Sequence, residues 1–382
     1  MKRLVTLILV ISMVLILSIT CLAETKTLKV GVVNPLTGSH AAYGARVINA
    51  IKIAVDEINN AGGIDMNGDK VLIEVISEDN EGVPSASVAA MNKLVFRDKI
   101  SVAISGALTP VTMADMQVTR EAKIPQLSAG AAGIMLTQQG NEYIFRVTGS
   151  DLNFTSAIIK YLADNFDAKK IGILCEQGDY GEGGAVLLTS NAEKLGLEVV
   201  TREIYQKGDK DFKAQLSRIK SKGAEVLINW GLYSEAARIA IQIKEMGWDV
   251  QLVGGSAYSD DKLIELAGEA VDGVIFCSTF IYTDTRPGVQ EFVKNYQERF
   301  EEAPGSNAGP AYDCVKIIAD AVKRANSLEP QDLRDAIAAT KNFPGVSGEI
   351  TFTETGDCLK EILICTIEKG EFIVLDTVKP EI

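Results

Sequence analysis

Apolar and polar positions along the chain follow two periods in turn, and together they predict alternating strands and helices. Leu28–Val33 is a short apolar run that predicts a buried strand. The next segment, Ala45–Asn60, has apolar residues at Val47, Ile51 and Ile58, the spacing of one helix face. Further strands are expected at Val71–Ile76, Ile100–Ser105, Ile124–Leu127, Lys170–Cys175, Leu197–Tyr205, Val226–Asn229, Gln251–Gly254 and Gly273–Cys277. Such alternation predicts an α/β fold of two doubly wound units, each with a parallel sheet and right-handed crossovers.

The C-terminal part departs from this alternation. Three expected helices, Pro287–Phe300, Pro310–Arg324 and Pro330–Ala339, precede a tail with period-two stretches and Thr-Gly-Asp and Lys-Gly-Glu turns. We expect this segment to add elements to both units. The chain would then cross between them several times, which makes a hinge rather than a single linker.

Length and composition fit this organisation. A chain of 382 residues with 47% hydrophobic and 23% charged residues is typical of a globular protein, and its length favours two domains. The net charge is −13, and removal of Lys2 and Arg3 with a leader would make it more negative. An acidic surface repels polyphosphate, so a nucleic-acid partner is not expected.

The first 23 residues read as a secretion signal. Lys2 and Arg3 precede the apolar run Leu4–Ile19, and small residues stand at Cys21 and Ala23. We expect cleavage after Ala23 and a periplasmic protein. Two alternatives remain at this stage: a lipoprotein acylated at Cys21, and an uncleaved membrane anchor, for which the apolar run is short.

The sequence offers little for catalysis. His40 is the single histidine, and its Gly/Ser loop has no nucleophile motif, so a solvated loop residue is the better interpretation. The chain contains no GxGxxG or P-loop motif, and acidic runs such as Asp260-Asp261 and Glu78-Asp79-Asn80 read as chance features of surface loops. We therefore expect no catalytic residues, no metal and no cofactor.

Cysteine usage argues against a disulfide framework, because five cysteines remain after the leader. Cys175 and Cys277 lie in strands expected to be buried. Cys358 and Cys365 lie on the predicted C-terminal hairpin, where they could pair or stay free.

Ligands of open α/β sheets bind at the carboxyl ends of the strands, and these ends supply the candidate site. Hydroxyl groups and aromatic rings gather there, and small residues let backbone groups approach a ligand. The candidate binding residues are Tyr43, Thr109, Ser128, Gly130, Ala132, Tyr180, Tyr233 and Ser256.

Several segments resemble one family, the leucine/isoleucine/valine-binding proteins of ABC transporters. They are GVVNPLTGSHAAYGARVINAIKIAVDEINNAGGI, VAISGALTPVTMAD, FRVTGSD, GDYGEGGA and KGDKDFKAQLSRIKSKGAEVLINWG. The resemblance implies a type I periplasmic binding protein, with two Rossmann-like lobes joined by three crossovers and closing on a ligand. On that basis residues 24–148 and 280–348 form the N-terminal lobe, and residues 149–279 and 349–382 form the C-terminal lobe.

The same resemblance implies roles for individual residues. Thr109 would bind the ligand carboxylate, with Gly130 and Ala132 beside it. Tyr43 would cover the side-chain pocket, and Tyr180 would face it from the second lobe.

Two positions depart from the amino-acid-binding members of the family. These members have a carboxylate where this chain has Ser256, and they tend to have threonine where it has Ala132. A buried ammonium needs a counter-charge, so another acid must hold the amino group or the ligand lacks one.

The resemblance implies a substrate-binding protein of an ABC importer for a small carboxylate-bearing solute, such as an apolar amino acid or a related acid or amide. Its expected partners are that ligand and an inner-membrane ABC permease, with the protein itself a monomer. The alternative is a periplasmic sensor that docks on a membrane receptor.

Overall fold

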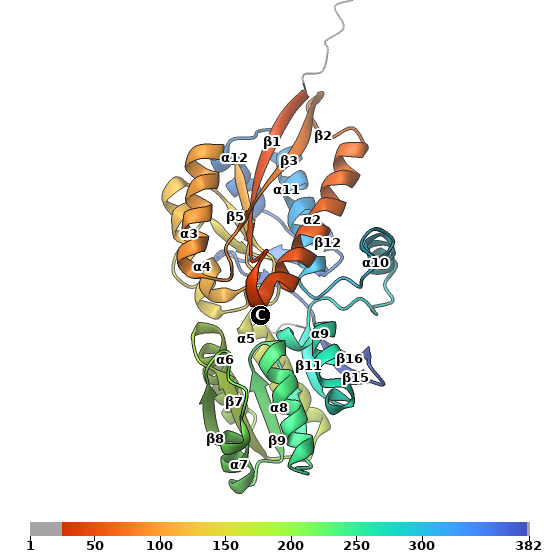
Figure 1. Cartoon of the computed structure of the whole chain (residues 1–382). Helices are drawn as coiled ribbons and strands as arrows, with labels where there is room; N and C mark the ends of the chain where they lie inside the picture. The colour runs from red at the N-terminus through yellow and green to blue at the C-terminus, as the bar shows by residue number, and fades with distance from the viewer. Residues whose placement is uncertain (1–24, 380–382) are drawn as a thin grey trace, which may run out of the picture.

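Two lobes stand one above the other in the computed structural model, which describes residues 25–379 (Figure 1). The expected signal segment and Cys21 lie outside the described residues. Each lobe has its own sheet of mostly parallel strands, which confirms the predicted fold class.

The first lobe contains a six-stranded sheet of order β2-β3-β1-β4-β5-β6. Only the edge strand β2 is antiparallel to its neighbour. All four residues of β4 are buried, as expected of a central strand covered on both faces. The strands are β1 (Thr25–Asn34), β2 (Ile64–Met66), β3 (Asp69–Asp79), β4 (Val102–Ser105), β5 (Gln126–Ser128) and β6 (Ile144–Arg146).

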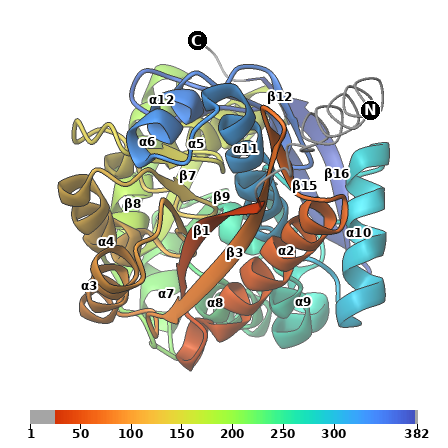
Figure 2. The same cartoon turned by 90° about the horizontal axis from the view of Figure 1, so that it is seen from above.

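Helices cover both faces of this sheet (Figure 2). One face is covered by α2 (Ala41–Asn60), α11 (Ala308–Ala325) and α12 (Pro330–Ala338), and α10 (Pro287–Phe300) packs on the outer side of α2 and α11. The other face packs against α3 (Pro84–Asn92), a π-helical turn at Lys93–Asp98 and α4 (Thr109–Ala122). Val47 and Ile51, on the predicted apolar face of α2, are fully buried against the sheet.

The second lobe contains a seven-stranded sheet of order β16-β15-β11-β10-β9-β7-β8. Strands β7 to β11 are parallel, and the last two strands are antiparallel. The strands are β7 (Lys170–Glu176), β8 (Glu198–Tyr205), β9 (Val226–Trp230), β10 (Gln251–Gly254), β11 (Ile275–Ser278), β15 (Ile362–Glu368) and β16 (Glu371–Val378). One face packs against α5 (Asp151–Asn165) and α6 (Asp179–Lys194), the other against α7 (Lys213–Ser221), α8 (Tyr233–Glu245) and α9 (Asp261–Ala267).

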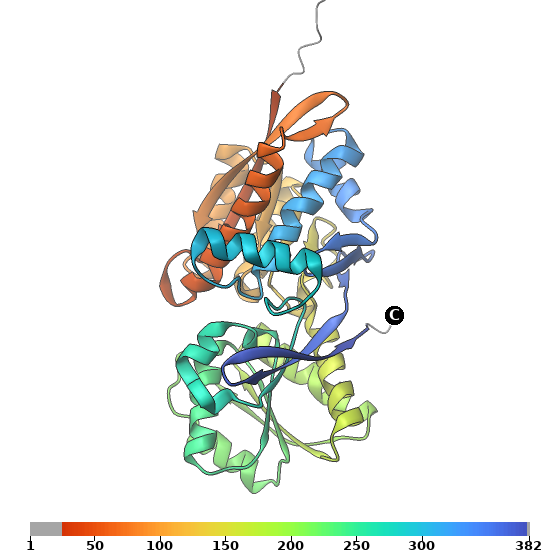
Figure 3. The same ribbon diagram turned by 90° about the vertical axis from the view of Figure 1, so that its right-hand side faces the viewer.

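The chain crosses between the lobes three times: between β6 and α5, between β11 and α10, and before β15 (Figure 3). A small sheet of β12 (Phe343–Gly345), β13 (Gly348–Phe352) and β14 (Cys358–Leu359) precedes the last crossing. Its buried residues Ile350, Phe352 and Cys358 belong to the core of the first lobe. Strands β13 and β14 therefore pack with the first lobe, whereas residues from 349 onward were expected in the second.

The cysteines of the described chain are all buried and free. Cys358 packs in the first core and Cys365 in the second, because the two tail hairpins belong to different sheets. The possible pairing of these two cysteines is therefore not made.

Candidate functional site

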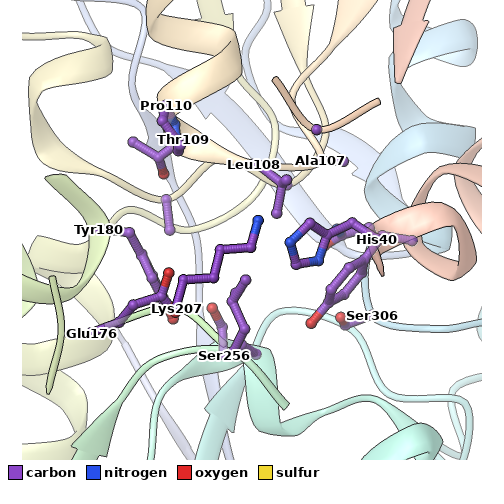
Figure 4. Close-up of a pocket in the computed structure, with 17 residues that line it drawn as sticks. His40, Ala107, Leu108, Thr109, Pro110, Glu176, Tyr180, Lys207, Ser256 and Ser306 are labelled. Carbon is purple, nitrogen blue, oxygen red and sulfur yellow. The ribbon is translucent and has the colours of Figure 1, made fainter. Parts of the chain in front are cut away.

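A cavity of about 110 Å³ lies between the two lobes, at the carboxyl ends of the strands (Figure 4). A single water molecule needs roughly 10–15 Å³ of such space, so the cavity has room for a small solute. The first lobe lines it with His40, Tyr43, Gly82, Ala107, Leu108, Thr109, Pro110, Gly130, Ala132, Ser306 and Asn307. The second lobe lines it with Glu176, Tyr180, Lys207, Leu232, Ser256 and Ala257.

Six of the eight candidate residues line this cavity: Tyr43, Thr109, Gly130, Ala132, Tyr180 and Ser256. The other two, Ser128 and Tyr233, lie behind its walls. The ring of Tyr233 packs against that of Tyr43, with 5.2 Å between the centroids. Ser128 is the last residue of β5 and fills the space beside Gly106, where an added Cβ would lie 2.2 Å from the serine Oγ.

Thr109 is the first residue of α4, and its hydroxyl faces the cavity from the first lobe (Figure 4). Its Oγ1 accepts a hydrogen bond from the backbone N–H of Gly133 at 3.1 Å. The hydroxyl hydrogen therefore remains available to a ligand. The first turn of α4 adds backbone N–H groups, although Pro110 has none, and together they make this wall suitable for an anion.

Arg146 holds the loop that carries Gly130 and Ala132. Its buried guanidinium donates from Nη1 to the carbonyl oxygens of Ala131 at 3.2 Å, of Gly133 at 3.0 Å, and of Ala132. Nε forms an ion pair with Asp357 at 3.0 Å. Arg146 thus fixes the backbone of the loop from behind. No pattern in the sequence indicated this role, although Arg146 belongs to FRVTGSD, one of the segments that carried the resemblance.

Gly130 is required by the close approach of the loop to Asn307. A Cβ at position 130 would lie 2.6 Å from Nδ2 of Asn307, which also lines the cavity. Any side chain here would therefore displace Asn307 from its place in the cavity wall.

Tyr180 forms the second-lobe wall with Ser256. Its ring packs on Trp230, with 6.2 Å between the centroids, and a Cβ at Gly255 would lie 3.1 Å from its hydroxyl. Burial raises the pKa of Tyr180 well above its usual value, with Asp151 adding to the shift. The phenol is therefore neutral and can donate a hydrogen bond.

His40 differs from its expected place in solvent. It is 4% exposed, at the end of a 3₁₀ turn (Gly38–His40), and it lines the cavity. Burial, assisted by the charge of Lys207, lowers its pKa to about 4. The imidazole is thus neutral at neutral pH and cannot act as a pH sensor there.

The acidic runs interpreted as chance surface features also have structural roles. Asp79 accepts hydrogen bonds from the backbone N–H of Leu36 at 2.8 Å and from the hydroxyl of Thr37 at 2.6 Å, which orders the loop after β1. Asp260 is completely buried and pairs with Arg46 of the other lobe, and Asp261 pairs with the same arginine. The first run is partly exposed but orders a loop, and the second is anchored by the buried Asp260.

Two charged lining residues were missing from the candidate list. Glu176 is the last residue of β7, and Lys207 follows β8. The rule that places ligands at the carboxyl ends of strands points to this region, but neither residue was among the candidates. Within residues 25–379 no group of three or more His, Cys, Asp or Glu residues is placed to hold a metal ion.

The sequence model of a family described as "Periplasmic binding protein" matches residues 27–370. The chain belongs to this family. A Leu/Ile/Val-binding protein homolog of Brucella suis is 31% identical over 330 residues, which are 86% of each chain. The predicted resemblance to the leucine/isoleucine/valine-binding proteins of ABC transporters is therefore confirmed.

Solved structures of the family share the fold. The branched-chain amino acid transporter substrate binding protein LivJ from Streptococcus pneumoniae, in complex with isoleucine, is 30% identical with a TM-score of 0.85, and the match covers 93% of this chain and 100% of that one. A solute binding protein of an ABC transporter from Rhodopseudomonas palustris, in complex with 3,4-dihydroxy benzoic acid, is 25% identical with a TM-score of 0.82, covering 92% and 97%. These relatives are binding proteins of transporters rather than enzymes. No helix between residues 25 and 379 is both long and apolar enough to cross a bilayer.

Proposed function

We propose that this protein is the substrate-binding protein of an ABC importer and captures a small carboxylate-bearing solute between its lobes. The observation that carries the proposal is the interlobe cavity, where Thr109 and the first turn of α4 form a wall suited to an anion. The volume of the cavity supports a small ligand.

The ligands of the two solved relatives support the same chemistry. Isoleucine and 3,4-dihydroxy benzoic acid differ in size and polarity, but both carry one carboxyl group. If the same wall binds the carboxyl group of each ligand, the other walls of the cavity determine which ligand binds best. In this protein the remaining walls are partly aromatic, from Tyr43 and Tyr180, and partly charged, from Glu176 and Lys207.

Closure of the lobes on the ligand is the proposed mechanism. A ligand that contacts both walls stabilises the closed conformation. The stabilisation equals the difference between its binding free energies for the closed and the open conformations. The closed protein, exported to the periplasm as a monomer, would then dock on an inner-membrane permease.

A thermal-shift screen of the mature chain tests the proposal. The panel contains amino acids, aliphatic acids, aromatic acids, amides and urea, and calorimetry follows each positive result. We expect at least one carboxylate to raise the melting temperature in a concentration-dependent way. Stabilisation by amides or urea alone, with every carboxylate inactive, would contradict the carboxylate assignment.

A further inference from the structure

Glu176 is the only carboxylate among the residues that line the cavity. It lies at the carboxyl end of β7, on the wall opposite Thr109 (Figure 4). Ser256, on the same side of the cavity, contributes no charge. The two walls thus differ electrostatically: the first lobe offers a helix N-terminus and a hydroxyl donor, and the second lobe offers an anion.

The carboxylate of Glu176 is incompletely paired. Its Oε2 is buried and has no hydrogen-bond partner within residues 25–379. Burial raises its pKa, the charge of Glu235 adds to this shift, and the backbone N–H of Leu232 and the charge of Lys207 oppose it. A buried carboxylate without a partner is costly, and a cation that pairs with it removes much of that cost.

The neighbouring charges leave this position open for a ligand. Lys207 is exposed, forms no ion pair with Glu176 in the described chain, and extends across the cavity toward Leu108 and His40 (Figure 4). Glu235, by contrast, is satisfied within the protein, because it accepts hydrogen bonds from the N–H of Gly208 at 2.9 Å and from Ser234. Glu235 does not line the cavity.

We infer that Glu176 is a specificity-determining residue that pairs with a cationic group of the ligand, so that the site prefers zwitterions to plain carboxylates. This inference rests on the proposed function. The carboxylate of the ligand would bind at Thr109 in the first lobe and its ammonium at Glu176 in the second, so that one small molecule connects both lobes.

The test compares matched pairs of acids that differ only in an amino group: leucine with isocaproate, phenylalanine with hydrocinnamate, and γ-aminobutyrate with butyrate. Isothermal titration calorimetry measures each pair on the wild type, on Glu176→Gln and on Glu235→Gln. Glutamine keeps an oxygen that can accept the Leu232 N–H while it removes the charge.

We expect at least one amino-bearing acid to bind wild type about tenfold or more tightly than its partner without the amino group. Glu176→Gln should abolish this preference, and it should bind the plain acid as tightly as wild type does or more tightly, because it removes a negative charge that repels the anion. Glu235→Gln should retain the preference, which would assign the effect to the carboxylate that faces the cavity.

Two results would overturn the inference while the proposed function stands: tighter binding of the plain acids by wild type, or an amino-group preference that survives in Glu176→Gln. If no carboxylate of any kind binds, the proposed function fails and this inference fails with it. A melting curve of each variant confirms that it is folded before its affinities are compared.

Discussion

Nη1 of Arg46 in the first lobe lies 2.7 Å from Oδ1 of Asp260 in the second lobe. Nη2 of the same arginine reaches Oδ1 of Asp261 at 2.8 Å. Arg46 is 3% exposed and Asp260 is completely buried, and neither residue lines the cavity. This ion pair joins α2 to the start of α9, so it forms only when the lobes are together.

Replacement of Arg46 by Met should weaken ligand binding although Arg46 does not line the ligand cavity. The variant leaves Asp260 buried without its partner in the closed arrangement, whereas an open arrangement lets water reach the carboxylate. We expect the dissociation constant to rise by about tenfold or more, measured by calorimetry with a ligand found in the screen.

The matched control for that variant is Arg299→Met. Arg299 pairs with Asp56 at 2.6 Å, but both residues belong to the first lobe. This variant should bind ligand as wild type does. Equal affinities of Arg46→Met and wild type would show that the interlobe pair contributes nothing to closure.

Thr109→Ala should remove the hydroxyl donor from the anion-binding wall. A hydrogen bond to a charged group contributes about 1.5–3 kcal/mol, and the variant should lose that much binding free energy for a carboxylate ligand. Thr109→Ser keeps the hydroxyl and should stay close to wild type. Calorimetry of the three proteins measures the difference, and unchanged affinity in the alanine variant would remove Thr109 from the site.

Arg146→Lys should disturb the cavity from behind. An ammonium cannot reproduce the planar fork of donors that reaches three carbonyl oxygens and Asp357. We expect a loss of at least about 2 kcal/mol in the free energy of unfolding, measured with urea. Ligand affinity should also fall under conditions where the variant remains folded, and a stability loss with unchanged affinity would contradict a positioning role.

The buried carboxyl group of Asp151 should make the free energy of unfolding fall as pH rises from about 4 to 7. Burial raises the pKa of its carboxyl from 3.8 to about 7, and both oxygens lack hydrogen-bond partners in the described chain. Between these values the folded state binds more protons than the unfolded state, so the free energy of unfolding falls with increasing pH.

Asp151→Asn removes that proton equilibrium. The melting temperature of the variant relative to wild type should therefore rise between pH 4.5 and pH 8, even if the two differ at the lower pH. Burial also raises the pKa of Asp115 to about 7. Because Asp115 is present in both proteins, its effect on the melting temperature cancels in the comparison. A difference that stays constant with pH would contradict the assignment.

The periodicity of the sequence predicted most strands of both sheets, because buried strands are continuous apolar runs between polar turns. Strand β9 was expected at Val226–Asn229 and spans Val226–Trp230. Strand β2, with only three residues, and helix α9, with seven, escaped because such short elements contain too few positions to show a period.

The charges around the site were harder to predict for a different reason. Arg46 and Asp260 are 214 positions apart, and no local pattern connects them. The Gly/Ser surroundings of His40 suggested exposure, but the cavity between the lobes takes it out of solvent. Burial that arises from contact between distant segments cannot be inferred from neighbouring residues alone.

The three crossings between the lobes also restrict how a partner protein can sense the ligand. A single connecting segment would permit twisting and sliding in many directions, whereas three segments must all bend together. Relative motion is then reduced to nearly one rotational coordinate, with its axis near the crossings. The distance between two surface points on opposite lobes would then depend on the angle of this rotation. A partner protein that contacts both lobes could therefore distinguish the occupied cleft from the empty one without contacting the ligand.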